Sequence, residues 1–176
     1  MKKKTLALVL ALTLLVAGVV GGTLAWLTDR TAEVKNTFTV GDINIGLTET
    51  TTDYKMVPGN TIAKDPTVTV KANSEACWLF VKVTKSENLD TFITYAIAEG
   101  WTALPGVDGV YYREVPASNA DQTFPVLAGN AVTVNSDVTK EMLTAKDFAN
   151  PTLTFKAYAV QKDNVASASD AWAKVN

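Results

Sequence analysis

Apolar and polar residues alternate along much of the chain after residue 25, and this period of two constrains the fold more than any other feature. In residues 67–72, threonine or lysine alternates with valine or alanine, and residues 79–84 and 153–160 show the same period. Successive side chains of a β-strand point to opposite faces of its sheet. Each segment is therefore expected to be a strand with one face toward a core.

Turn-forming residues separate these segments. Glycine supplies positive φ and proline fixes φ, so short clusters that contain either residue mark turns. Such clusters lie at residues 58–60, 105–109, 128–130 and 150–151. Further strands are expected at residues 37–47, 92–98, 110–115, 123–127 and 131–135. Many short strands separated by turns predict an all-β fold, built as a two-sheet β-sandwich.

Two short helices are expected in addition to the strands. Residues 139–144 begin with Thr139, which can cap a helix N-terminus. Near the C-terminus, Ala168, Trp172 and Val175 recur at helical spacing behind a serine cap. Trp172 is expected to close one end of the sandwich.

The first 25 residues have the three-part layout of a secretory signal. Three lysines at 2–4 precede an apolar run at 6–20, and small residues follow. The pattern predicts export and cleavage between Ala25 and Trp26. The alternative is a retained membrane anchor over residues 6–27, a length that almost reaches a spanning helix.

Composition argues against several classes of function. The chain has no histidine, which removes the commonest general base and the commonest metal ligand. It also lacks an Asp-rich calcium loop. We therefore predict no enzyme activity, no catalytic residue, no metal site and no cofactor. The single cysteine, Cys77, lies in an apolar run and is expected to be a buried thiol.

The charge balance argues against a nucleic-acid partner. Removal of Lys2, Lys3 and Lys4 with the signal leaves 13 basic against 18 acidic residues, a net charge of −5. A mildly acidic chain offers no basic surface to a phosphate backbone. Neither DNA nor RNA is expected to bind.

Short motifs near both ends and in the middle of the chain resemble those of the TasA/camelysin family of exported matrix-fibre and cell-surface proteins. The most specific motif is Gly-Gly-Thr-Leu-Ala-Trp-Leu-Thr-Asp at 21–29, followed by Asn-Thr-Phe-Thr-Val-Gly at 36–41. The remaining motifs are Val-Pro-Gly at 57–59, Lys-Asp-Pro-Thr-Val at 64–68, Ala-Tyr-Ala-Val-Gln at 157–161 and Asp-Ala-Trp at 170–172. Residues 88–150 show no such match.

This resemblance implies a jelly-roll-like sandwich over residues 41–176. It implies secretion to the extracellular matrix or cell surface of a Gram-positive bacterium, with a SipW-type signal peptidase as the processing partner and membrane contact only through the uncleaved signal. In fibre-forming members an N-terminal segment adds as a strand to the next subunit. Here the donor would be residues 26–40, entering a copy of this chain or a related fibre subunit. Its apolar residues are Leu27, Val34, Phe38 and Val40.

Three alternatives stay open at this point. Phe38 and Val40 can instead belong to the protein's own first strand. The chain can be a monomeric surface adhesin that contacts its ligand through Trp101, Tyr111 and Tyr112, although these aromatic residues also suit core or sheet-face packing. A camelysin-like protease is the third alternative, and the absence of histidine argues against a zinc protease site.

Overall fold

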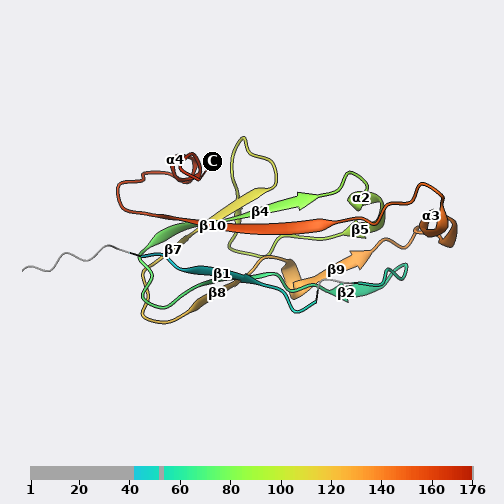
Figure 1. Cartoon of the computed structure of the whole chain (residues 1–176), viewed down its shortest axis with the longest axis horizontal. Coiled ribbons are helices and arrows are strands. Elements are labelled where there is room, and N and C mark those ends of the chain that lie inside the picture. Colours follow the sequence, from blue (N-terminus) through green and yellow to red (C-terminus); the bar gives the residue numbers. More distant parts are fainter. Residues whose placement is uncertain (1–41, 52–53, 176) are drawn as a thin grey trace, which may run out of the picture. The chain divides into compact units, whose positions relative to one another are not determined.

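The computed structural model describes residues 42–51 and 54–175. In these residues ten β-strands form three antiparallel sheets, and the helices are short (Figure 1). The largest sheet has four strands in the order β10-β4-β7-β6. Their bounds are Leu153–Gln161 (β10), Cys77–Lys85 (β4), Val110–Val115 (β7) and Thr102–Ala103 (β6). β10 pairs with β4 along all nine of its residues.

The other two sheets have three strands each, in the orders β1-β3-β8 and β2-β9-β5. The first contains Ile45–Thr48 (β1), Thr67–Val70 (β3) and Gln122–Pro125 (β8). The second contains Thr61–Ala63 (β2), Ala131–Val134 (β9) and Ile93–Thr94 (β5). The same two stretches of chain contribute strands to both sheets. One stretch contains β2 and then β3, and the other contains β8 and then β9.

The division between the two small sheets falls at Pro66 and the 3₁₀ turn Ala128–Asn130. Proline has no N–H to give to a strand ladder, so the ladder is interrupted at this position. Two backbone hydrogen bonds still join the connections, from Val126 N–H to Pro66 O (2.9 Å) and from Lys64 N–H to Asn130 O (2.8 Å). The predicted sandwich-like, all-β fold is confirmed, with one of its layers split into two sheets.

The main core lies between the four-stranded sheet and the sheet β1-β3-β8. Val68 and Val70 of β3 and Leu79 and Val81 of β4 are fully buried there. These are the inward positions of the period-two pattern, so burial of one face of each strand accounts for the alternation.

A second cluster covers the outer face of the four-stranded sheet. Trp78 and Phe80 of β4 point to this face and pack under the C-terminal helix α4 (Ala168–Trp172). The Trp172 ring lies 5.2 Å from the ring of Phe80 and 5.2 Å from that of Tyr158, measured between centroids. Trp172 therefore covers a sheet face, and the expectation that it closes an end of the sandwich is wrong.

The two expected helices are present. α3 (Lys140–Thr144) begins at Thr139, whose hydroxyl accepts a hydrogen bond from Met142 N–H (3.3 Å). α4 begins in the same way at Ser167, which accepts from Asp170 N–H (3.1 Å). These side chains satisfy backbone donors that a helix N-terminus leaves unpaired.

The segment 92–98, expected to be a strand, differs from the expectation. The structure has a third short helix, α2 (Leu89–Phe92), and then only the two-residue strand β5 and an isolated bridge between Ile97 and Leu127. Leu89 and Phe92 are the buried residues of α2. Phe92 packs in a third apolar cluster with Val134 and Val138, so tertiary burial fixes a turn of helix that local propensity does not predict.

Replacement of Trp172 by alanine tests the importance of the outer cluster. Because Trp172 is only 6% exposed, Trp172→Ala is expected to lower the free energy of unfolding by about 3–5 kcal/mol. Urea unfolding measures the change. Lys174→Ala, an exposed change in the same segment, is the matched control and should shift stability by less than about 0.5 kcal/mol. Equal effects of the two substitutions would contradict this role of the cluster.

Cys77 provides a second test of the core. Its side chain is fully buried, and burial raises the pKa of the thiol to about 11. The thiolate is the reactive form, so the folded protein is expected not to react with a thiol reagent at neutral pH. Reaction should begin only when denaturant unfolds the chain. Rapid labelling of the folded protein would show that Cys77 is accessible.

Candidate functional site: an open sandwich side and a buried lysine

The residues predicted for signal cleavage (Ala25 and Trp26) and for strand donation (Leu27, Val34, Phe38 and Val40) lie outside the described residues. The three aromatic residues predicted for ligand contact, Trp101, Tyr111 and Tyr112, are among the described residues.

The three aromatic side chains do not converge on one surface. Trp101 is 9% exposed, and its indole N–H donates to Pro125 O (2.8 Å). Tyr111 and Tyr112 are neighbours in β7 and point to opposite faces of the sheet. Tyr111 packs against the core between the sheets, whereas Tyr112 packs against the outer cluster, 6.0 Å from the ring of Trp78. These contacts agree with the alternative interpretation of core and sheet-face packing.

One side of the sandwich exposes the edges of two strands. β10 is an edge strand of the four-stranded sheet and pairs with β4 alone in the described part of the chain. β1 is likewise an edge strand and pairs with β3 alone. The two edges belong to opposite layers and contact each other (Figure 1). In the described residues, the layers meet on this side through side chains, and no backbone ladder joins β1 to β10.

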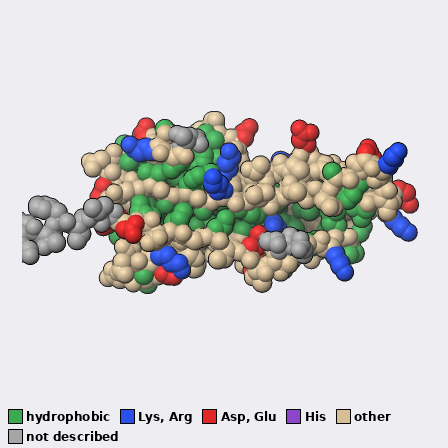
Figure 2. Space-filling view, viewed as in Figure 1, with side chains coloured by type: hydrophobic (Ala, Val, Ile, Leu, Met, Phe, Trp, Pro, Cys, Tyr) green, Lys and Arg blue, Asp and Glu red, His purple; other side chains and the backbone are tan. Residues whose placement is uncertain are grey.

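A groove lies between these two edges, with a volume of about 360 Å³. Leu47 of β1 lines one wall and is one of the exposed large hydrophobic residues. Leu153 and Phe155 of β10 line the other wall. Figure 2 shows hydrophobic side chains reaching the surface between the two layers on the face that carries β1 and β10. The groove thus combines apolar walls with unpaired strand edges.

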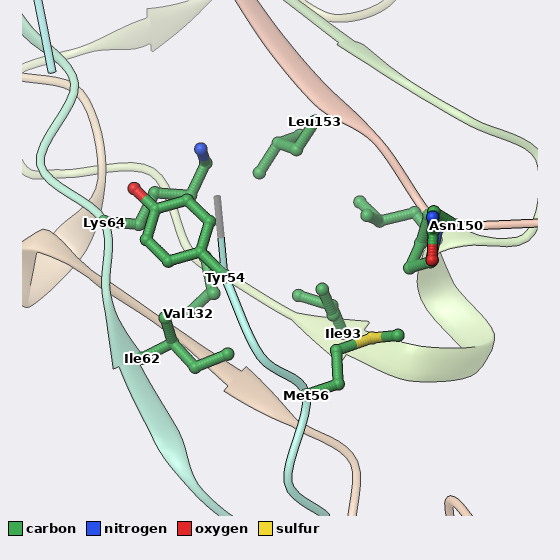
Figure 3. A pocket seen from close by; sticks show the side chains of 10 residues that line it. Tyr54, Met56, Ile62, Lys64, Ile93, Val132, Asn150 and Leu153 are labelled. Carbon is green, nitrogen blue, oxygen red and sulfur yellow. The ribbon is translucent and has the colours of Figure 1, made fainter. Parts of the chain in front are cut away.

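A second cavity of about 240 Å³ adjoins the groove (Figure 3). Apolar side chains from three strands form most of its wall, among them Ile62 of β2, Ile93 of β5 and Val132 of β9. Its polar groups are at its margins: Lys64 and the hydroxyl of Tyr54 lie at one end, and Asn150 lies at the other. Lys64 and Leu153 line both the cavity and the groove.

Lys64 is the buried charge at this junction. Its residue surface is 8% exposed, and its Nζ lies 2.6 Å from Glu49 Oε1. The ammonium also lies over two aromatic rings, 4.9 Å from the centroid of Tyr54 and 5.4 Å from that of Phe155. A buried charge is costly unless it is paired, and the carboxylate and the ring faces supply the pairing.

Hydrogen bonds hold Glu49 and the residues next to this ion pair in place. The Tyr54 hydroxyl donates to Glu49 Oε1 (2.8 Å). Burial and this hydrogen bond to the carboxylate raise the pKa of Tyr54, so the phenol keeps its proton and remains a donor. Next to Glu49, Thr50 donates its N–H to Asp65 Oδ1 (2.9 Å) and its hydroxyl to Asp65 Oδ2. The segment 49–50 is thus bonded to the segment 64–65 at two successive positions, Glu49 to Lys64 and Thr50 to Asp65.

The sequence showed Lys64 only as part of a motif, and its burial was not predicted. The signal was present in the alternation, because residues 64, 66, 68 and 70 are all buried and share one face. Lys64 thus occupies an inward position of a strand pattern whose other members are proline and valine. A charged residue at such a position indicates a partner that neutralises it.

Neither a metal centre nor a membrane span is found in the residues that the structure describes. No group of three or more Cys, Asp or Glu side chains is placed to hold a metal ion in 42–51 and 54–175. None of the helices in the same residues has the length and apolar character needed to cross a membrane. Comparison with known proteins finds no matching family model, curated protein or solved structure.

The Thr50–Asp65 bonds predict a particular dependence of stability on pH. The two hydrogen bonds from Thr50 lower the pKa of Asp65 below its ordinary value of 3.8. A lowered folded-state pKa stabilises the protein above the unfolded-state pKa, and this stabilisation is lost as the pH falls through the folded-state value. Asp65→Asn should therefore be less stable than the parent protein at neutral pH, and the difference should shrink on acidification below 3.8.

Urea unfolding at a series of pH values measures this difference. Asp163→Asn, a substitution in an exposed turn, is the matched control. A difference between Asp65→Asn and the parent that stays constant from neutral pH to the acid limit would show that the carboxylate charge does not contribute.

Proposed function

We propose that this chain is an exported structural or accessory subunit of extracellular biofilm-matrix fibres, and that it assembles by strand donation after its first 25 residues are removed. The observation that carries the proposal is the nine-residue edge of β10, which faces the groove beside β1. The three-part signal at the N-terminus and the motifs that resemble the TasA/camelysin family support it. A SipW-type signal peptidase is the proposed processing partner.

An exposed strand edge has a direct physical use. Its unpaired N–H and C=O groups can bind an extended segment from another chain, which then becomes an additional strand. Proteins commonly protect such edges by shortening or bending them or by covering them. β10 is instead as long as the central strand β4 that it pairs with. A donated strand would satisfy this edge and cover the apolar walls of the groove.

The proposed donor, residues 26–40, has a pattern that suits this groove. Val34, Phe38 and Val40 are separated by even numbers of residues, so they point to one face of an extended strand. Leu27 has the opposite parity and would point to the other face. One face of the donor can thus contact Leu47, Leu153 and Phe155, while its backbone pairs with the β10 edge.

The proposed function requires no catalysis. The sequence contains no histidine, and the described residues contain no metal cluster that could take its place. The polar groups at one end of the cavity are engaged with Glu49: Lys64 forms an ion pair with it, and Tyr54 donates a hydrogen bond to it. These contacts support a structural role, in which the same residues hold the walls of an assembly groove in place.

Electron microscopy and sedimentation of two chains test the proposal. A chain that begins at Trp26 should form filaments, and a chain that begins at Gly41 should remain monomeric because it lacks the donor. Filaments should also fail to form from the longer chain with Phe38→Asp, since a carboxylate would enter an apolar groove. Thr37→Asp, which has the opposite parity, is the matched control and should assemble.

A peptide of residues 26–40 should bind the chain that begins at Gly41, and Leu47→Asp in the groove should weaken this binding. If the longer chain stays monomeric at every concentration and joins no fibre of its host, the proposed function is wrong.

A further inference from the structure

The ion pair of Lys64 and Glu49 differs from the other ion pairs of the described residues in its burial. Its two side chains are 10% and 17% exposed. In the other three pairs the side chains are between 43% and 66% exposed. Exposed pairs are stabilised in their charged form by water, whereas a buried pair has lost most of that hydration.

Aromatic rings and apolar side chains surround Lys64 Nζ beside its carboxylate partner. Its Nζ lies between the rings of Tyr54 and Phe155, and Pro66 and Leu153 line the same groove. A reaction that joins the two groups would remove both charges from this apolar site, together with the desolvation cost of the ion pair. A lysine amine is a nucleophile, and in such a reaction it would attack the carboxyl carbon of Glu49 once a proton has passed from the ammonium to the carboxyl group.

The two groups are also held close to each other. Lys64 Nζ is 2.6 Å from Glu49 Oε1, so it lies next to the carboxyl carbon Cδ. The Thr50–Asp65 hydrogen bonds fix the neighbouring residues, and Lys64 N–H is bonded to Asn130 O (2.8 Å). Two reactants fixed in this way react as if at very high concentration.

Tyr54 supplies the third group that such a reaction needs. Its hydroxyl donates to Glu49 Oε1 (2.8 Å), the oxygen that also contacts Lys64 Nζ (2.6 Å), and it shares its proton with a second acceptor, Thr51 O. A hydrogen-bond donor at a carboxyl oxygen stabilises the negative charge that develops when the carbon is attacked, and it assists departure of that oxygen. The amine, the carboxyl group and the donor therefore lie together in one largely buried site.

We propose that Lys64 and Glu49 form an intramolecular amide bond. Lys64 Nζ attacks Glu49 Cδ, an N–C bond forms, and one C–O bond of the carboxyl group breaks. The departing oxygen leaves as water, with both of its protons coming from the ammonium group of Lys64. No oxidation or reduction occurs, and no co-reactant is required. The bond joins the residue after β1 to the connection between β2 and β3.

This cross-link would fix the β1 wall of the groove to the other strands of its layer. It closes a ring over residues 49–64 and so restricts the unfolded chain in the way that a disulfide does. The chain has one cysteine and so cannot form an internal disulfide. The amide forms within a single chain and does not depend on fibre assembly.

Intact-mass spectrometry of the purified, folded protein tests the proposal. The N-terminus is first identified, and the measured mass is compared with that of the sequence from that residue. The protein should be lighter by one water molecule. After tryptic digestion, cleavage should be absent after Lys64, and the fragment that contains Lys64 should remain attached to the fragment that contains Glu49.

Lys64→Met should restore the full sequence mass, because the variant has no amine at this position. Lys82→Met, which replaces an exposed lysine of β4, is the matched control and should keep the deficit. Succinimide formation at Asp108-Gly109 would also lower the mass by one water. That deficit would persist in Lys64→Met, and its persistence would overturn the assignment of the bond to Lys64 and Glu49. A folded parent protein with its full sequence mass would overturn the proposal without any variant.

Discussion

The structure depends on the burial of β4 from both sides. One face of this strand contributes Leu79 and Val81 to the core between the layers, and the other contributes Trp78 and Phe80 to the cluster under α4. A strand with two buried faces needs apolar residues at successive positions, which explains the unbroken run in residues 77–81. The neighbours β10 and β7 are positioned by pairing with this strand. The open edge of β10 is thus fixed by a core that lies one strand away.

The sequence was informative where one physical cause dominates. Burial of one strand face produces alternation, which located β3, β10 and the second half of β4, and side-chain capping located α3 and α4. The sequence pattern did not predict the features that tertiary contacts determine. Leu89 and Phe92 form a helical turn because both are buried against neighbouring elements. Trp172 covers a sheet face because Phe80 and Tyr158 lie there, which no local pattern encodes.

The same distinction applies to the site. Strand edges cannot be recognised before the strand order is known, so neither β10 nor β1 could be identified as an edge from the alternation. Lys64, Glu49 and Tyr54 are separated by up to 15 residues and meet only because Thr50 and Asp65 bring their segments together. Alternation alone could have placed Lys64 on the inner face, but its partner belongs to a different strand connection. Electrostatic partners of this kind are set by topology.

The full-length pairing of β10 with β4 has a mechanical consequence. Their nine paired residues lie antiparallel, with the hydrogen bonds perpendicular to the strands. A pull directed along β10 acts across all of these bonds together, and they share the force. A pull that lifts one end of β10 away from β4 would open these hydrogen bonds one after another, and it would meet less resistance. A strand laid along the outer edge of β10 transmits tension in the first direction, so a filament joined there would hold best when stretched along its strands.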